Sequence, residues 1–222
     1  MDLFSHQVYI ETQRTKGDRA VAASLMRCWK AMGMPDFLQF DNELSFRGSN
    51  KYPRSPGLII RLCLHYGIQP VFIPPGEPWR NGVIEKFNDT YSKKFFRQQW
   101  FPSYRTLKRQ SKNFQRFHNS RHRYSCLKGK TPLEVVQNHK FQPITLGGNT
   151  KIPQLDEVPY GVINLIRFIR SNHSLDIFGE KFLVPKDLGY SYVKAVIDTQ
   201  IESLQVYLGD KLVTVFEYRL TA

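Results

Sequence analysis

Acidic residues are few in this sequence of 222 residues. Nineteen Asp and Glu stand against 32 Lys and Arg, which gives a formal net charge of +13 at neutral pH. A basic excess of this size favours a polyanionic partner, with nucleic acid first and an anionic membrane surface second. A basic but inert surface is the alternative, because net charge reports on association and not on fold.

Paired cysteines and long apolar runs are also missing. Cys28, Cys63 and Cys126 are far apart, include no CxxC pair, and have no histidine nearby at zinc-finger spacing. This pattern argues against a disulfide framework and against a zinc finger, and it is typical of a reducing cytoplasmic compartment. No apolar run approaches the ~20 residues that span a bilayer, and we expect no signal peptide. We therefore expect no membrane partner.

The first 137 residues alternate strand and helix patterns. Apolar runs rich in β-formers predict strands at 6–14, 37–40 and 68–73. Helical periodicity predicts helices at 19–32, with Asp18 as N-cap, and at 57–66, about 81–99 and about 104–119. The Gly- and Pro-rich stretch 42–56 is expected to be a loop. This alternation is typical of an α/β fold.

The composition and pattern of the sequence change after residue 137. Residues 138–159 carry scattered Gly, Pro and Asn and are expected to be a linker. From residue 160 onward, short strands are predicted at 162–170, 174–177, 181–184, 192–198, 204–207 and 211–218. Short, regularly spaced strands favour a small barrel or sandwich. The predicted organisation is therefore a domain at 1–137, a linker at 138–159 and a small β domain at 160–222.

Two acidic residues carry the chemistry that the sequence can offer. Asp41 ends the apolar strand Phe-Leu-Gln-Phe, and an aspartate at a strand end is either exposed or liganded, because burying it unpaired is costly. Glu85 lies early in the predicted helix 81–99, on a face shared with Asn88 and Asp89. Two carboxylates from separate elements can hold Mg²⁺ through oxygen ligands. Taken singly, Asp41 could equally be an ordinary turn residue, and Glu85 could equally be a solvated glutamate on a helix.

The sequence motifs around these two residues are more specific than the residues themselves. The chain contains F-D-N-E-L-S-F, H-Y-G-I-Q-P-V-F-I-P-P, E-P-W-R-N-G-V-I-E-K-F-N and N-S-R-H-R-Y-S-C-L-K-G-K-T-P-L-E. These stretches resemble the retroviral-integrase-like catalytic core of DDE transposases of bacterial insertion sequences. The later stretches G-V-I-N-L-I-R-F-I-R and Y-S-Y-V-K-A-V-I-D resemble the small β-barrel domain, of the Mu-transposase type, that follows this core in some of them.

The resemblance implies a fold, a reaction and a cofactor. It implies an α/β, RNase H-like integrase core followed by a small all-β, SH3-like barrel domain. It also implies metal-dependent phosphodiester cleavage and strand transfer on DNA with Mg²⁺ or Mn²⁺. Asp41 and Glu85 match the second acidic residue and the glutamate of the family's triad, and are the expected catalytic residues and metal ligands. Homo-oligomers on DNA in a cytoplasmic, nucleoid-associated setting are implied as well.

The family's first catalytic aspartate has no match here. Met1-Asp2-Leu3-Phe4-Ser5 resembles a stretch downstream of that aspartate, so the first core strand is expected to be absent and the chain to be a truncated, inactive copy. A site that holds two metal ions needs a carboxylate that bridges them, and the missing aspartate leaves such a site incomplete. Asp2 or Glu11 completing the site is the minority alternative. Another is a catalytically silent DNA-binding or regulatory fragment that pairs with an intact transposase, and a third is a barrel that mediates assembly.

The basic excess gathers between residues 86 and 130. This stretch holds thirteen Lys or Arg and one acidic residue, Asp89, a net charge of +12. A solvated face would normally mix signs, so DNA phosphate contact is favoured. The residues expected to contact DNA or substrate are Asn42, Asn81, Gly82, Lys86, Asn88, Lys93, Lys94, Arg97, Arg121, Arg123 and Lys130. His65, His118 and His122 are interpreted as structural or surface residues, because none has an evident catalytic partner.

Overall fold

The computed structural model describes residues 1–48, 51–139, 144–148 and 151–221, and it shows a mixed α/β fold. Its helices are α1 (Asp18–Met32), α2 (Leu44–Arg47), α3 (Leu58–His65), α4 (Gly82–Lys94), α5 (Tyr104–Arg121) and α6 (Pro132–Gln137). Its strands are β1 (Phe37–Phe40), β2 (Gln69–Phe72), β3 (Val162–Phe168), β4 (Ser174–Ile177), β5 (Glu180–Leu183), β6 (Tyr192–Asp198), β7 (Ser203–Leu208) and β8 (Lys211–Glu217). Short 3-10 turns are η1 (Pro78–Asn81), η2 (Phe96–Gln98), η3 (Ser125–Leu127) and η4 (Lys186–Leu188).

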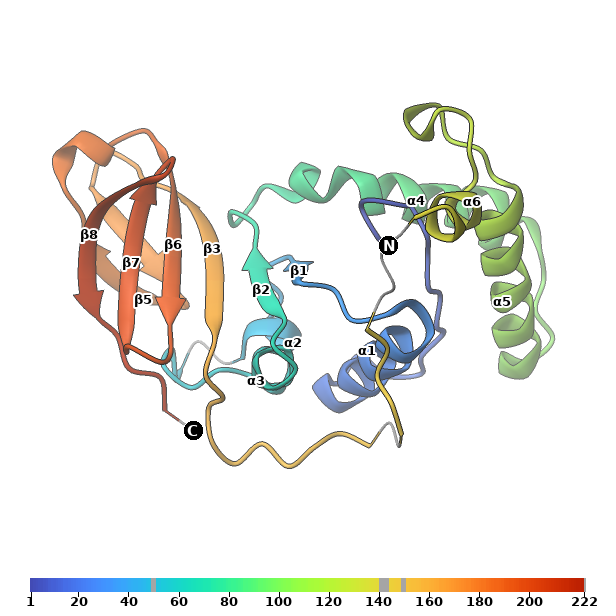
Figure 1. Ribbon diagram of the computed structural model, residues 1–222, viewed down its shortest axis with the longest axis horizontal. Helices are drawn as coiled ribbons and strands as arrows, with labels where there is room; N and C mark the ends of the chain where they lie inside the picture. Colours follow the sequence, from blue (N-terminus) through green and yellow to red (C-terminus); the bar gives the residue numbers. More distant parts are fainter. Residues whose placement is uncertain (49–50, 140–143, 149–150, 222) are drawn as a thin grey trace.

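One six-stranded sheet runs through most of the molecule in the order β1-β2-β3-β6-β7-β8, and β4 and β5 form a separate hairpin. β1, β2 and β3 are parallel, whereas β3, β6, β7 and β8 are antiparallel. Figure 1 shows the sheet at the left and centre, with α4 running at the top from near β1 and β2 toward α5 at the right. Within the predicted small β domain, β3, β6, β7 and β8 thus continue the sheet of the predicted core, while the SH3-like character of that domain stays a prediction.

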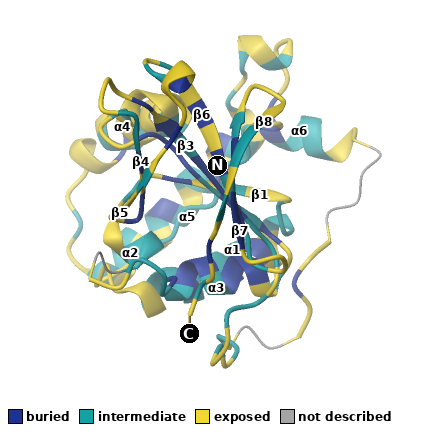
Figure 2. Ribbon diagram, turned by 90° about the vertical axis from the view of Figure 1, so that its left-hand side faces the viewer, coloured by how far each residue is buried: buried dark blue, intermediate teal, exposed yellow. Residues whose placement is uncertain are grey.

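The core follows from strands and helices that are apolar on their inner faces. α3 buries five of its eight residues, and the inner faces of β3, β6 and β7 are almost wholly buried (Figure 2). Trp29 of α1 and Phe72 of β2 belong to the same buried cluster as Ile163 of β3. This shared cluster fixes β1 and β2 against the C-terminal strands.

A second, aromatic cluster joins α4 to α5. Phe87 and Phe95 are buried, Tyr91 stacks between them, and Phe114 and His118 meet them from α5 at ring distances of 4.9 to 5.4 Å. The aromatic residues interleaved with the cations of 86–130 therefore pack mostly inward. His118 is buried within this cluster, so its ring packs inside the fold, and its interpretation as a structural histidine stays a prediction.

The prediction of a strand at 6–14 is wrong, because no strand in the described part of the chain pairs with this segment. Side chains of α5 take the place of a partner strand. The Asn119 amide accepts from Val8 N and donates to Val8 O, both at 3.0 Å, and Ile10 N donates to Gln115 Oε1 at 2.7 Å. The β-formers therefore yield an extended segment held by a helix.

Three smaller predictions also need correction. The N-cap of α1 is Gly17, so Asp18 is instead the first residue of the helix. The predicted loop 42–56 contains the short helix α2, and its residues 49 and 50 lie outside the described part. The helix predicted to reach residue 99 ends at Lys94, because Phe95 leaves helical geometry as its ring enters the aromatic cluster.

The predicted linker 138–159 has no regular secondary structure where it is described, and its residues 140–143 and 149–150 lie outside that part. The described stretches still contact the fold. Met34 N donates to Ile144 O at 2.8 Å, and Arg61 Nη1 donates to Leu155 O at 3.0 Å. The segment therefore lies along α1 and α3, and the domain boundaries remain predictions.

Candidate metal and nucleic-acid site

The tip of β1 forms one side of the candidate site. Asp41 follows the last residue of β1 and is exposed, and its Oδ1 accepts from Glu43 N at 3.0 Å. Ile73 lies directly after β2, and its N–H donates to Phe40 O at 3.1 Å. Because β1 and β2 are parallel, their carboxyl ends lie at one edge of the sheet, where open α/β folds bind ligands. Asp41 therefore lies at this edge of the sheet.

Asn42 serves the fold through both ends of its amide. Its Nδ2 donates to Ile73 O at 2.6 Å, and its Oδ1 accepts from Arg167 Nη2 at 3.1 Å. Its own main-chain oxygen accepts from Arg47 Nε at 3.0 Å. These bonds leave the side chain little freedom to read DNA, so we assign Asn42 a role in shaping the turn.

The start of α4 lies against β1. Gln39 Nε2 donates to Asn81 Oδ1 at 2.6 Å and to Arg80 O at 3.3 Å. Asn81 is the N-cap residue of α4, and Glu85 comes one turn later on an exposed face. Gly82 has nothing within 4 Å of the position that a Cβ would take, so this helix start is open to an approaching substrate.

The cations of α4 and its neighbourhood differ in how free they are. Lys86, Asn88, Lys94 and Arg97 are exposed. Lys93 Nζ pairs with Asp89 Oδ2 at 2.9 Å, which offsets part of its charge. Burial, followed by the charge of Lys94, lowers the pKa of His122, so the end of α4 lies near the end of α5. Arg121, which closes α5, is exposed as well.

The loop between α5 and α6 is braced by one of its own arginines. Arg123 Nη1 donates to Gly129 O at 2.8 Å and pairs with Glu134 Oε2 at 3.2 Å. Glu134 also closes a capping box with Thr131 at the start of α6. Arg123 therefore holds the loop, and Lys130 beside it is exposed.

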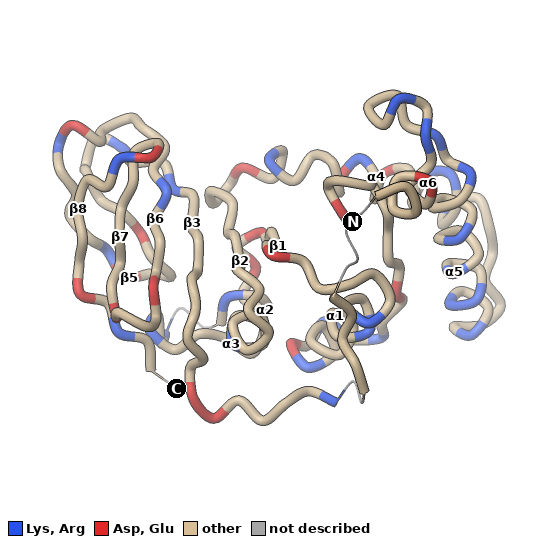
Figure 3. The backbone as a smooth tube through the Cα atoms, viewed as in Figure 1, with Lys and Arg blue, Asp and Glu red and all other residues tan. Residues whose placement is uncertain are grey.

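α5 carries a row of cations along one face. We call Arg105, Lys108, Arg109, Lys112 and Arg116 the α5 basic stripe, because they are three or four residues apart and line one surface hollow. α5 itself contains no acidic residue. Figure 3 shows Lys and Arg gathered on α5 and in the loop that follows it. The stripe presents a positive surface, and its five residues lie within the basic stretch 86–130, for which the sequence predicts contact with DNA phosphates.

Asp2 and Glu11, the alternative third ligands, are both engaged elsewhere. The Asp2 carboxylate accepts from Ser5 N at 2.8 Å, from the Ser5 hydroxyl and from Phe4 N. Glu11 pairs with Arg27 at 2.7 Å and accepts from Ser24 and Tyr9. Burial opposes ionisation of Glu11, but its bonds to Arg27 and Ser24 outweigh burial and lower its pKa.

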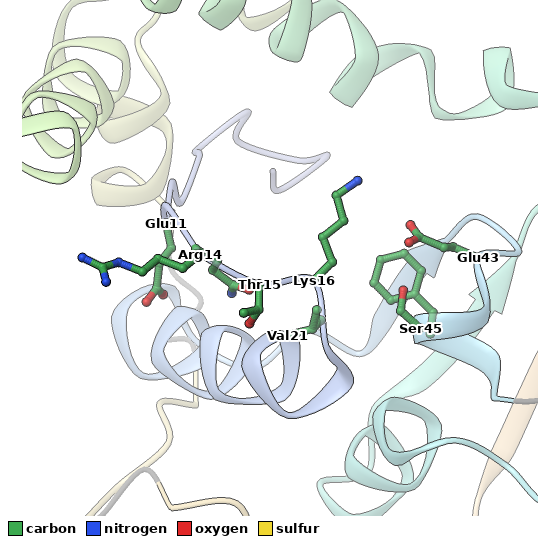
Figure 4. A pocket seen from close by; sticks show the side chains of 9 residues that line it. Glu11, Arg14, Thr15, Lys16, Val21, Glu43 and Ser45 are labelled. Carbon is green, nitrogen blue, oxygen red and sulfur yellow. The ribbon is translucent and has the colours of Figure 1, made fainter. Parts of the chain in front are cut away.

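A surface hollow beside the β1 tip is lined by Glu11 and Lys16 of the N-terminal segment, by Val21 of α1, and by Glu43 and Phe46. Figure 4 shows Glu11 turned down toward α1 and Glu43 at the opposite end of the hollow. The two carboxylates therefore do not converge. Among the described residues, no group of three His, Cys, Asp or Glu side chains is placed to hold a metal ion.

Asp41 and Glu85 nevertheless have the right chemistry for Mg²⁺ or Mn²⁺. Both offer carboxylate oxygens, the hard donors that these ions prefer. Mg²⁺ is commonly bound through one or two carboxylates, with water and substrate phosphates in the remaining positions. Two protein ligands therefore fit an ion that is shared with DNA, and they fit poorly an ion held by protein alone.

Comparisons with known proteins address the same region. The comparison with curated proteins gives no match. In the described part of the chain, no helix has the length and apolarity needed to cross a membrane. One family model, described as Integrase core domain, matches residues 66–132. That match includes β2, α4 with Glu85, and α5 with its basic stripe, and Asp41 lies before it. This part of the chain is therefore similar to an integrase or transposase core.

Proposed function

We propose that the chain is a DNA-processing core of integrase or transposase type, with Asp41 and Glu85 as ligands of Mg²⁺ or Mn²⁺. At the level of the matched family, the function is DNA integration or transposition. The observation that carries the site is the contact of Gln39 with Asn81 and Arg80, which brings the β1 tip beside the start of α4. Asp41 lies two residues after Gln39, and Glu85 lies four residues after Asn81.

In this proposal the chain's own residues bind and orient the DNA. Lys86 and Asn88 flank Glu85 on exposed positions of α4 and contact the phosphates next to the reacting bond. Lys94, Arg97 and Arg121 continue the positive surface toward the end of α5. A divalent ion at Asp41 and Glu85 would supply Lewis-acid stabilisation of a phosphoryl oxygen.

The test is Mn²⁺-dependent nicking of duplex DNA by the purified chain. Asp41→Asn and Glu85→Gln should each lower the rate by about 100-fold or more, the cost of removing a group that stabilises the transition state. Asp36→Asn is the matched control, because Asp36 is exposed and precedes the same strand at its other end. Nicking that survives both site changes would discard the assignment.

A catalytically silent DNA-binding role is the second candidate. The observation that favours it is the α5 basic stripe together with the lack of a three-carboxylate group among the described residues. In that case the wild-type chain binds DNA without nicking it, and Asp41→Asn leaves the affinity unchanged. Both candidates are compatible with self-association on DNA, which light scattering of the protein with and without a DNA duplex would measure.

A further inference from the structure

Arg167 of β3 is a buried cation whose hydrogen bonds within the described part of the chain all go to uncharged oxygens. It is 5% exposed, and burial lowers its pKa to about 10 against the opposing charge of Asp176. Its Nε donates to Asp176 O at 3.0 Å, its Nη1 to Ile166 O at 2.9 Å and Ile73 O at 3.2 Å, and its Nη2 to Asn42 Oδ1 at 3.1 Å. Arginine is rarely buried without a carboxylate, so these four bonds must compensate for its desolvation.

Two of these four bonds reach the residues that surround Asp41. Ile73 N donates to Phe40 O, directly before Asp41, and Ile73 O accepts from the side chain of Asn42, directly after it. Asp41 is thus flanked by two residues that are both attached to Ile73. Arg167 bonds to Ile73 O and to Asn42 Oδ1 together, and so closes this small network from the side of β3.

The network depends on the guanidinium of Arg167. Without the guanidinium, Asn42 Oδ1 loses its donor, and Ile73 O keeps only the Asn42 amide. A partly satisfied buried network is unfavourable, so the amide would turn to find other partners and release the residue after Asp41. Such outer partners are known to control metal affinity through the ligands that they orient.

We propose that Arg167 is a positioning residue for Asp41, so that β3 forms part of the candidate site at the end of β1. The position of the turn follows from the contacts alone, while the consequence for metal binding rests on the proposed function. The ligand affected is a divalent cation that binds the carboxylate of Asp41.

The experiment follows the Glu43 amide by NMR, because its N–H donates to Asp41 Oδ1 and reports on that carboxylate. Hydrogen exchange of this amide measures the order of the turn, and Mn²⁺-induced broadening of the same signal measures ion binding. Arg167→Gln should speed the exchange and raise the Mn²⁺ concentration needed for broadening, each by about tenfold. Arg170→Gln is the matched control, because Arg170 is exposed just beyond β3, and it should leave both values unchanged.

A second variant covers the case in which Arg167→Gln fails to fold. Asn42→Ala cuts the same link from the other side and leaves Arg167 its three bonds to main-chain oxygens, so it should reproduce both effects. Arg167→Lys should show smaller changes in exchange rate and in Mn²⁺ concentration than Arg167→Gln does. The reason is that an ammonium can still donate to some of the same oxygens, although to fewer than the guanidinium fork.

The outcomes separate the two proposals. Exchange and broadening that stay at wild-type values in folded Arg167→Gln or Asn42→Ala would overturn the positioning role. Faster exchange in these variants, combined with wild-type broadening that Asp41→Asn does not abolish, would support positioning by Arg167 and reject Asp41 as the metal ligand.

Discussion

The α5 basic stripe allows a quantitative prediction about DNA binding. Its first and last members, Arg105 and Arg116, are eleven residues apart, which corresponds to about 16 Å along a helix. Lys112 stands 3.8 Å from the centre of the Tyr9 ring and bonds to Gln115, so it is engaged within the fold. The other four are exposed, and among the described residues none of them pairs with a carboxylate.

The magnitude follows from counterion release. Each duplex phosphate that a cation neutralises contributes about 0.9 to the slope of log affinity against log salt concentration. Four free cations of the stripe would therefore contribute about 3.6 to the slope. The double change Lys108→Gln and Arg109→Gln should lower the slope by about 1.8, whatever the DNA sequence.

Fluorescence anisotropy of a labelled duplex, titrated with protein at several salt concentrations, measures this slope. The control is Lys181→Gln with Lys211→Gln, which removes the same charge from exposed positions in β5 and β8. A slope that falls equally in both double variants would show a general charge effect. A slope unchanged by the α5 pair would remove the stripe from the DNA interface.

Two further predictions concern stability. Burial, reinforced by the charge of His122, lowers the pKa of His118 to about 4 from an ordinary value near 6.5. The unfolded chain therefore takes up a proton first, and about 3 kcal/mol of the free energy of unfolding should be lost as the pH falls from 6.5 to 4. In denaturant titrations His118→Gln should flatten this dependence, whereas His65→Gln, at an exposed position, should keep it. Asn119→Ala removes both bonds to Val8 and should cost about 2 kcal/mol, with hydrogen exchange at Val8 rising more than elsewhere. Exchange at Val8 that stays at the wild-type rate would show that α5 does not hold this segment.

Local signals predicted most of the regular elements. β1, β4 and β6 have the predicted bounds, and α5 and α6 begin where Ser103 and Thr131 offer capping side chains. These elements are fixed by periodicity and by capping, which act over a few residues. The predicted acidic pair was also placed on the right kinds of element, a strand tip for Asp41 and an exposed helix face for Glu85.

Long-range pairing was beyond the reach of the sequence. The segment 6–14 has the composition of a strand, but a strand needs a neighbour, and its hydrogen bonds go to Asn119 and Gln115 more than a hundred residues away. Asn42 reads as a turn residue that is free to touch substrate. Its partner Arg167 lies 125 residues later, in a stretch that composition assigns to another domain.

The same limit explains why the predicted domain boundary gives no hint of the sheet that crosses it. β3 pairs with β2 at only two positions, Val71 with Asn164 and Phe72 with Leu165. So short a ladder needs side chains to reinforce it. Asn164 Nδ2 donates to Gln69 Oε1 at 3.1 Å, and Arg167 bonds to Ile73 just past the end of β2. Each of these contacts joins β3 to β2, and β2 in turn pairs with β1, the strand that ends at Asp41. The strand tip is therefore connected to residues 160–222 through β2, and we expect a substitution in either part to alter the order of the other.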